Sequence, residues 1–177
     1  RSNDTCYNMA MKFRGFLRPE PLLVCAIIMA FIITVGLSIW SRSGHLVFDS
    51  PDALVNYHFS RFWSETWTLT FPASGVPGYE YVVPRSAKVA GASIVPAGFW
   101  GLPFFYGSLN VLFPSLLLPY WTLIFAVIGL LAWYWLWKKV WSIPAAIIIL
   151  ALTAFHPAWW YYSFRSLLPN VLFCSLV

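Results

Sequence analysis

The chain has 177 residues, of which 60% are apolar, including a 20% share of aromatic residues, and only 10% are charged. Soluble domains carry roughly 25% charged residues, so this composition excludes a soluble domain. Residues 21–41, 89–137 and 140–164 contain no Asp, Glu, Lys or Arg. Because about 20 apolar residues cross a bilayer, we expect an integral membrane protein, whose net charge of +5 reflects topology signals rather than nucleic-acid binding.

The first apolar segment, residues 22–40, is predicted to be a transmembrane helix. It is longer than the roughly 7 to 15 apolar residues of a signal peptide, which favours an uncleaved anchor. By the positive-inside rule, the tail of residues 1–21 is cytoplasmic. This assignment rests on the basic residues of the tail, which are Arg1, Lys12, Arg14 and Arg18.

Residues 41–113 are predicted to form an extracytoplasmic loop with juxtamembrane or re-entrant helices. Ser50 as an N-cap and Pro51 at the first helical position indicate a helix over residues 50–66. Its apolar stripe is expected to lie on the membrane surface and consists of Val55, Phe59, Phe62 and Trp63. Residues 94–113 are interrupted by several prolines and glycines, which favours an interfacial or re-entrant element over a lipid-facing helix.

Residues 114–137 and 140–162 are predicted to be the second and third transmembrane helices. If residues 94–113 also crossed the membrane, Lys138 and Lys139 would lie outside, against the positive-inside rule. Residues 164–177 would start a further helix that is truncated, so we expect the N-terminal part of a longer protein. The predicted fold is an all-α, multi-span helical bundle in the plasma membrane.

Asp52 falls in the first turn of the predicted helix over residues 50–66, together with Asn56 on one side of it. It is either part of an ordinary surface helix or a general base that deprotonates an acceptor hydroxyl at the membrane boundary. Arg85 and Lys88 can bind a phosphate or simply face lipid headgroups, and the same two interpretations apply to Arg165. His and Cys residues show no metal-ligand spacing, so no cofactor is expected; a divalent metal has no support from the spacing.

Short motifs along residues 20–177 resemble those of the GT-C class of membrane glycosyltransferases. The resemblance is greatest to the dolichyl-phosphate-mannose-protein mannosyltransferase-like branch, family 39. The order and spacing of the motifs carry this resemblance. They are Pro51-Asp52, Asn56-Tyr57-x-Phe59, Ser64-Glu65-Thr66 with Leu69, Pro84-Arg85-Ser86, Val95-Pro96, Gly101-Leu102-Pro103 with Tyr106-Gly107, Lys138-Lys139, Pro157, Trp159 to Ser163 with Arg165, and Leu168-Pro169-Asn170.

The resemblance implies transfer of a sugar from a polyprenyl-phosphate-linked donor to an acceptor hydroxyl, with inversion, on the outer face. By position, Asp52 would be the catalytic base, with Asp49 as the alternative. The acceptor is a protein, a lipid or a glycan. Candidate substrate-binding residues are Arg85, Lys88, Asn56, Tyr57, Glu65 and Arg165.

Two departures from the family pattern weaken a paired-acid or metal-assisted mechanism. Ala53 follows Asp52 where the family often has a second acid, and Asn170 stands where many members have another. An oligosaccharyltransferase-like catalytic subunit and a noncatalytic transporter or scaffold remain alternatives. A transporter should carry charged residues within its membrane helices, whereas every acid here lies in the outer loop or the N-terminal tail.

Overall fold

The computed structural model describes residues 19–43, 50–75, 86–165 and 167–176, of which 78% are helical. Two helical segments are long and apolar enough to cross a membrane. One is α2 (Pro19–Ser43), and the other joins the 3-10 helix η2 (Ser115–Tyr120) to α5 (Trp121–Val140). The prediction of a mostly helical protein is therefore confirmed, and two of its helical segments are candidate membrane spans.

A third candidate span is broken into α6 (Ile143–Ala154) and α7 (Pro157–Phe164), which meet at an angle of 54°. We had predicted one continuous helix over residues 140–162. Proline disfavours the helical conformation of the residue before it and removes a backbone donor, so Pro157 ends α6 and begins α7. The Nδ1 atom of His156 caps α7 by accepting a hydrogen bond from the Ala158 N–H, at 3.2 Å.

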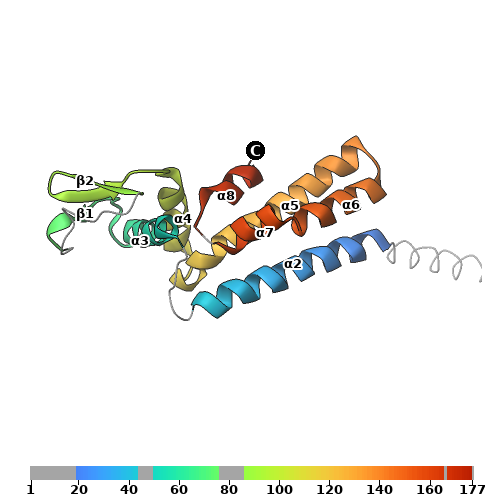
Figure 1. The fold of residues 1–177 in the computed structure, drawn as a ribbon, viewed down its shortest axis with the longest axis horizontal. Coiled ribbons are helices and arrows are strands. Elements are labelled where there is room, and N and C mark those ends of the chain that lie inside the picture. The colour runs from blue at the N-terminus through green and yellow to red at the C-terminus, as the bar shows by residue number, and fades with distance from the viewer. Residues whose placement is uncertain (1–18, 44–49, 76–85, 166, 177) are drawn as a thin grey trace, which may run out of the picture.

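Helices α2, α5, α6 and α7 pack side by side around one apolar core (Figure 1). Phe31 of α2 and Leu130 of α5 are fully buried there. Outward-facing side chains such as Leu22 and Leu37 are exposed, as in a helix that faces lipid. At one end of this group, Glu20 accepts a hydrogen bond from the Tyr134 hydroxyl at 2.5 Å and forms an ion pair with Lys138.

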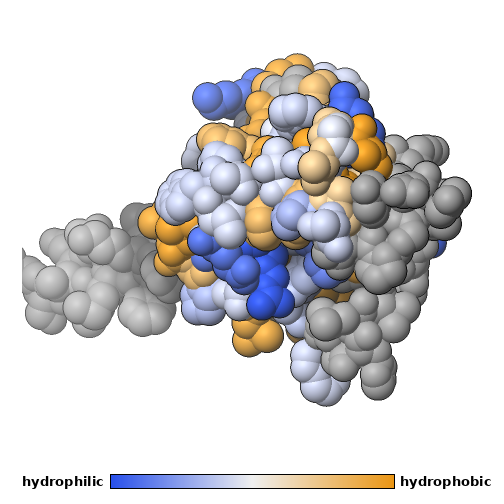
Figure 2. All heavy atoms as spheres, turned by 90° about the vertical axis from the view of Figure 1, so that its left-hand side faces the viewer, coloured by the Kyte–Doolittle hydropathy of each residue, from blue (hydrophilic) through white to orange (hydrophobic). Residues whose placement is uncertain are grey.

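The opposite end of the long helices carries a second group of elements, which we call the end layer (Figure 1). It consists of α3 (Pro51–Thr66), α4 (Gly101–Leu112) and a small sheet. The predicted helix is confirmed and begins at Pro51 after an extended Ser50, but the Ser50 side chain makes no capping hydrogen bond. Figure 2 looks onto this layer and shows a hydrophilic patch near its middle, bordered by apolar side chains.

The sheet has three antiparallel strands in the order β1-β3-β2 and was not predicted from the sequence. Strands β1 (Phe71–Pro72), β2 (Ala87–Ala90) and β3 (Ser93–Pro96) are too short to show an alternating pattern. Gly91 and Ala92 join β2 to β3 in a two-residue turn. The positive φ of Gly91, 62°, is the conformation that such a hairpin turn requires at its first central residue.

The sheet covers the apolar stripe of α3, so the prediction that this stripe lies on the membrane surface is wrong. Val55 and Phe59 are buried in a cluster with Ala87 of β2. The Phe59 ring lies 4.9 Å from the ring of Phe71, between centroids. On the other side of α3, Gly107 of α4 approaches so closely that an added Cβ would lie 2.6 Å from the backbone oxygen of Ser60.

Candidate functional site

Asp52 lies half-buried in the first turn of α3. The hydroxyl of Ser86 donates a hydrogen bond to its Oδ1 atom at 2.5 Å. Ser86 directly precedes β2, so the hairpin that covers α3 also brings this hydroxyl to the carboxylate. The N-terminal turn of a helix favours a negative charge, and a hydrogen bond from Ser86 orients the carboxylate. Asp52 is thus an oriented carboxylate at the start of α3.

Asn56 lies one helical turn after Asp52 and is buried. Its Nδ2 atom donates a hydrogen bond to the backbone oxygen of Leu167 at 2.9 Å. We had named Asn56 as a substrate-binding residue. Its amide donor instead holds the segment between α7 and α8 (Pro169–Leu176) against α3.

The backbone of Leu167 is held from a second side as well. Its N–H donates a hydrogen bond to the Thr122 hydroxyl of α5 at 3.0 Å. The Tyr106 hydroxyl of α4 lies 3.3 Å from that hydroxyl oxygen of Thr122. We call Asn56, Tyr106, Thr122 and the backbone of Leu167 the Leu167 clamp. Leu167 is fully buried and has a φ of 65°, a left-handed conformation that a bulky residue adopts only under constraint.

Neither Tyr106 nor Thr122 was among the candidate site residues predicted from the sequence. The available signal was Thr122 itself, an isolated hydroxyl in a long uncharged apolar segment, where a buried polar side chain needs a partner. Burial raises the pKa of Tyr106 to about 12, against a smaller lowering by its hydrogen bond with Thr122. The phenol therefore stays neutral near pH 7 and serves as a hydrogen-bonding group of the clamp.

Arg165 caps the end of α7, and its guanidinium carbon lies 4.4 Å from the centroid of the Tyr161 ring. It precedes Leu167 by two residues, a distance of at most about 7 Å along the chain. Asp52 and Asn56 are one helical turn apart, about 6 Å. The Leu167 clamp therefore links α3, one turn after Asp52, to the segment that follows Arg165 at the end of α7.

The other candidates lie at different distances from Asp52. Glu65 is 13 residues beyond Asp52, about 20 Å along the helix axis, and forms an exposed ion pair with Arg61 at 2.8 Å. Tyr57 is half-buried against the apolar cluster that contains Tyr106 and Leu167, and its ring contacts that of His58 edge-on, with centroids 5.6 Å apart. Lys88 is exposed on β2, two residues after Ser86. Asp49 and Arg85 lie outside the described residues.

Within the described ranges, no three His, Cys, Asp or Glu side chains gather in a way that could hold a metal ion. Comparison of the chain with protein-family models, curated proteins and solved structures finds no match. A function for this chain therefore has to be argued from its own residues and their geometry.

Proposed function

We propose that this chain carries the active site of a membrane glycosyltransferase that uses a polyprenyl-phosphate-linked sugar. The observation that carries the proposal is the carboxylate of Asp52, which is oriented by Ser86 at 2.5 Å and lies in the layer at the end of the long apolar helices. A lipid-linked donor presents its sugar and phosphate at that level, just beyond the acyl chains. The resemblance of the sequence motifs to the GT-C class agrees with this location.

In the proposed reaction, the acceptor hydroxyl attacks the anomeric carbon as the bond from that carbon to the phosphate oxygen breaks. The proton of the hydroxyl passes to Asp52, and the polyprenyl phosphate leaves. A single displacement of this kind inverts the anomeric configuration. Arg165 follows α7 and is linked to the start of α3 through the Leu167 clamp, and a guanidinium binds phosphate oxygens well.

We further propose that α2, the segment from η2 to α5, and the α6 and α7 pair cross the plasma membrane as parts of a multi-span bundle. The end layer then lies outside, while Lys138, Lys139 and the N-terminus lie inside. The ion pair between Glu20 and Lys138 supports a common level for the start of α2 and the end of α5. The acceptor in this proposal is a protein, lipid or glycan hydroxyl.

The test is Asp52→Asn in the full-length protein, in membranes supplied with a radiolabelled polyprenyl-phosphate hexose. Asparagine keeps the size of the side chain and can still accept a hydrogen bond from Ser86, but it cannot take a proton. We expect transfer to fall by about 10²- to 10⁴-fold, the usual contribution of a general base. Glu65→Gln is the matched control because it removes an exposed carboxylate from the same helix.

Asp49→Asn decides between the two acids that precede and begin α3. Loss of transfer in Asp49→Asn with normal transfer in Asp52→Asn would move the role of base to Asp49. Normal transfer in both variants, with normal membrane insertion, would leave α3 as a noncatalytic structural element and would refute the mechanism.

A further inference from the structure

The outward side of α4 and its flanks is apolar and uncovered. Phe99, Leu112 and Leu116 expose 72%, 76% and 77% of their surfaces. Neighbouring exposed apolar residues are Trp100, Phe104, Val111 and Phe113. The opposite side of α4 is buried, and Gly107 lies on it in close contact with α3. Soluble proteins rarely expose large apolar surfaces without a partner, so these exposed side chains call for an apolar environment.

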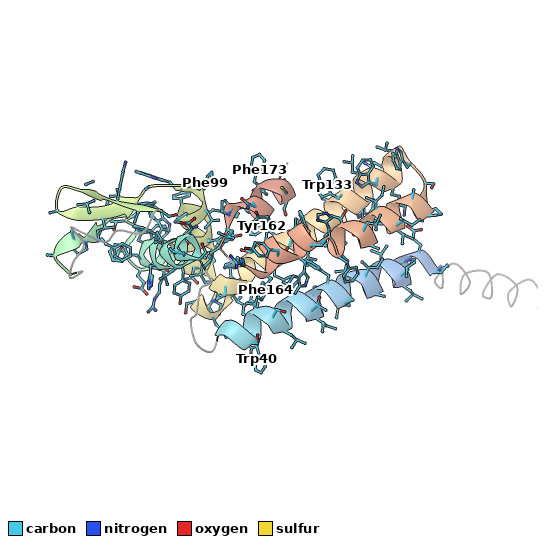
Figure 3. All side chains as sticks on the ribbon, in the orientation of Figure 1. Trp40, Phe99, Trp133, Tyr162, Phe164 and Phe173 are labelled. Carbon is cyan, nitrogen blue, oxygen red and sulfur yellow. The ribbon has the colours of Figure 1, made fainter. Side chains whose placement is uncertain are left out.

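The position of α4 indicates what covers it. Figure 1 shows that α4 runs across the direction of α2 and α5 and lies between the rest of the end layer and the long helices. Its 12 residues span about 18 Å, much less than the roughly 30 Å of a bilayer core. Phe99, labelled in Figure 3, lies where the sheet leads into α4. At its other end, α4 leads directly into the candidate span that begins at Ser115.

The charge pattern agrees with this position. Residues 89–137 contain no Asp, Glu, Lys or Arg, so no charge in α4 or its flanks favours bulk water. Helices that lie in the membrane interface by themselves usually carry Lys and Arg on a polar side. In α4 the polar side chains are used against α3 instead: Ser108 accepts a hydrogen bond from the Trp63 indole at 3.1 Å, and Asn110 donates to Ser64 at 2.9 Å.

We propose that the exposed apolar side chains of α4 and its flanks, Phe104, Val111 and Leu112 in the helix with Phe99, Trp100 and Leu116 beside it, are embedded in the boundary between lipid headgroups and acyl chains, with the helix axis parallel to the membrane. The occupant of this surface is phospholipid. Because α4 has no charge, zwitterionic lipid suffices for its insertion. This proposal does not depend on the glycosyltransferase reaction, since it concerns only how the end layer meets the bilayer.

The experiment places an environment-sensitive fluorophore on single cysteines in a variant without Cys6, Cys25 and Cys174. Leu112→Cys reports on α4, Ile33→Cys marks the middle of α2, and Ala92→Cys marks the exposed hairpin turn. The labelled full chain is reconstituted in phosphatidylcholine vesicles. Quenching is then measured with iodide in the water and with lipids that carry a spin label either near the headgroup or deep in the acyl chain.

We expect the probe at Leu112 to be quenched most by the shallow lipid label and the probe at Ile33 most by the deep one. The probe at Ala92 should respond mainly to iodide. If Leu112→Cys disturbs the fold, Leu116→Cys gives the same test from the neighbouring exposed position. A probe on α4 that responds to iodide as the Ala92 probe does, or that is shielded from both iodide and lipid by another protein surface, would overturn the proposal.

Discussion

Gly107→Ala tests the close contact on which the end layer depends. The added Cβ would lie 2.6 Å from the backbone oxygen of Ser60 and 2.6 Å from Cδ1 of Trp63. Ordinary van der Waals contacts of a Cβ begin near 3.4 Å. The indole can shift slightly, but the oxygen of Ser60 belongs to the interior of α3 and moves only if the two helices separate. The substitution therefore forces α4 away from α3.

The expected cost follows from two opposing terms. Overpacking of a tight contact costs about 1 to 3 kcal/mol, and two clashing atoms, one of them in the backbone, place Gly107 near the upper value. Alanine in a helix interior regains about 1 kcal/mol relative to glycine. The net loss is about 2 kcal/mol, which for a chain of this size lowers Tm by about 4 to 8 °C.

Gly101→Ala is the matched control, because Gly101 begins the same helix and nothing lies within 4 Å of its added Cβ. Its effect should fall between zero and a gain of about 1 kcal/mol. The measurement is thermal unfolding of each purified variant in detergent, followed by tryptophan fluorescence. If Gly107→Ala unfolds at the same temperature as Gly101→Ala, or at a higher one, the close approach of α3 and α4 is not a feature of the protein.

Two further outcomes are expected from the same unfolding assay. Thr122→Val should destabilise the protein by about 1 to 3 kcal/mol because it leaves the buried N–H of Leu167 without an acceptor. Thr122→Ser keeps the hydroxyl and should cost clearly less. Equal losses of stability in the two variants would contradict the clamp. Desolvation, and secondarily the charge of Arg61, lower the pKa of His58 below its ordinary value of 6.5. The unfolded chain then binds a proton more readily, so Tm should hold above pH 6.5 and fall below it. A pH profile unchanged in His58→Gln would show that His58 does not contribute.

The parts of the fold that local signals determine were predictable. The start of α3 at Pro51 follows from a proline at the first helical position after a serine, and the long helices follow from uncharged apolar segments. The sheet was missed because its strands of two to four residues carry almost no pattern. Because the sheet was missed, the apolar stripe of α3 was predicted to lie on the membrane surface, whereas it contacts the sheet and α4.

The candidate site was only partly predictable because its contacts join distant parts of the chain. Asp52 was identified from its place at a helix start, but its partner Ser86 lies 34 residues away. The hydrogen bond from Asn56 to Leu167 spans 111 residues, and nothing near Asn56 in the sequence indicates it. Glu65 was grouped with Asp52 because their motifs follow closely in sequence. The two residues are 13 positions apart in one helix, which is about 20 Å along its axis.

The Leu167 clamp has a mechanical consequence. The carbonyl of Leu167 is bound from α3 and its N–H from α5, so a displacement of α3 would pull on the peptide groups just before α8. Helix α8 in turn packs tightly at the middle of α5, where an added Cβ on Gly129 would meet the Ser175 hydroxyl at 2.6 Å. Strain that begins at the first turn of α3, for example when a ligand displaces Ser86 from Asp52, would thus be transmitted deep into the apolar helices through two hydrogen bonds.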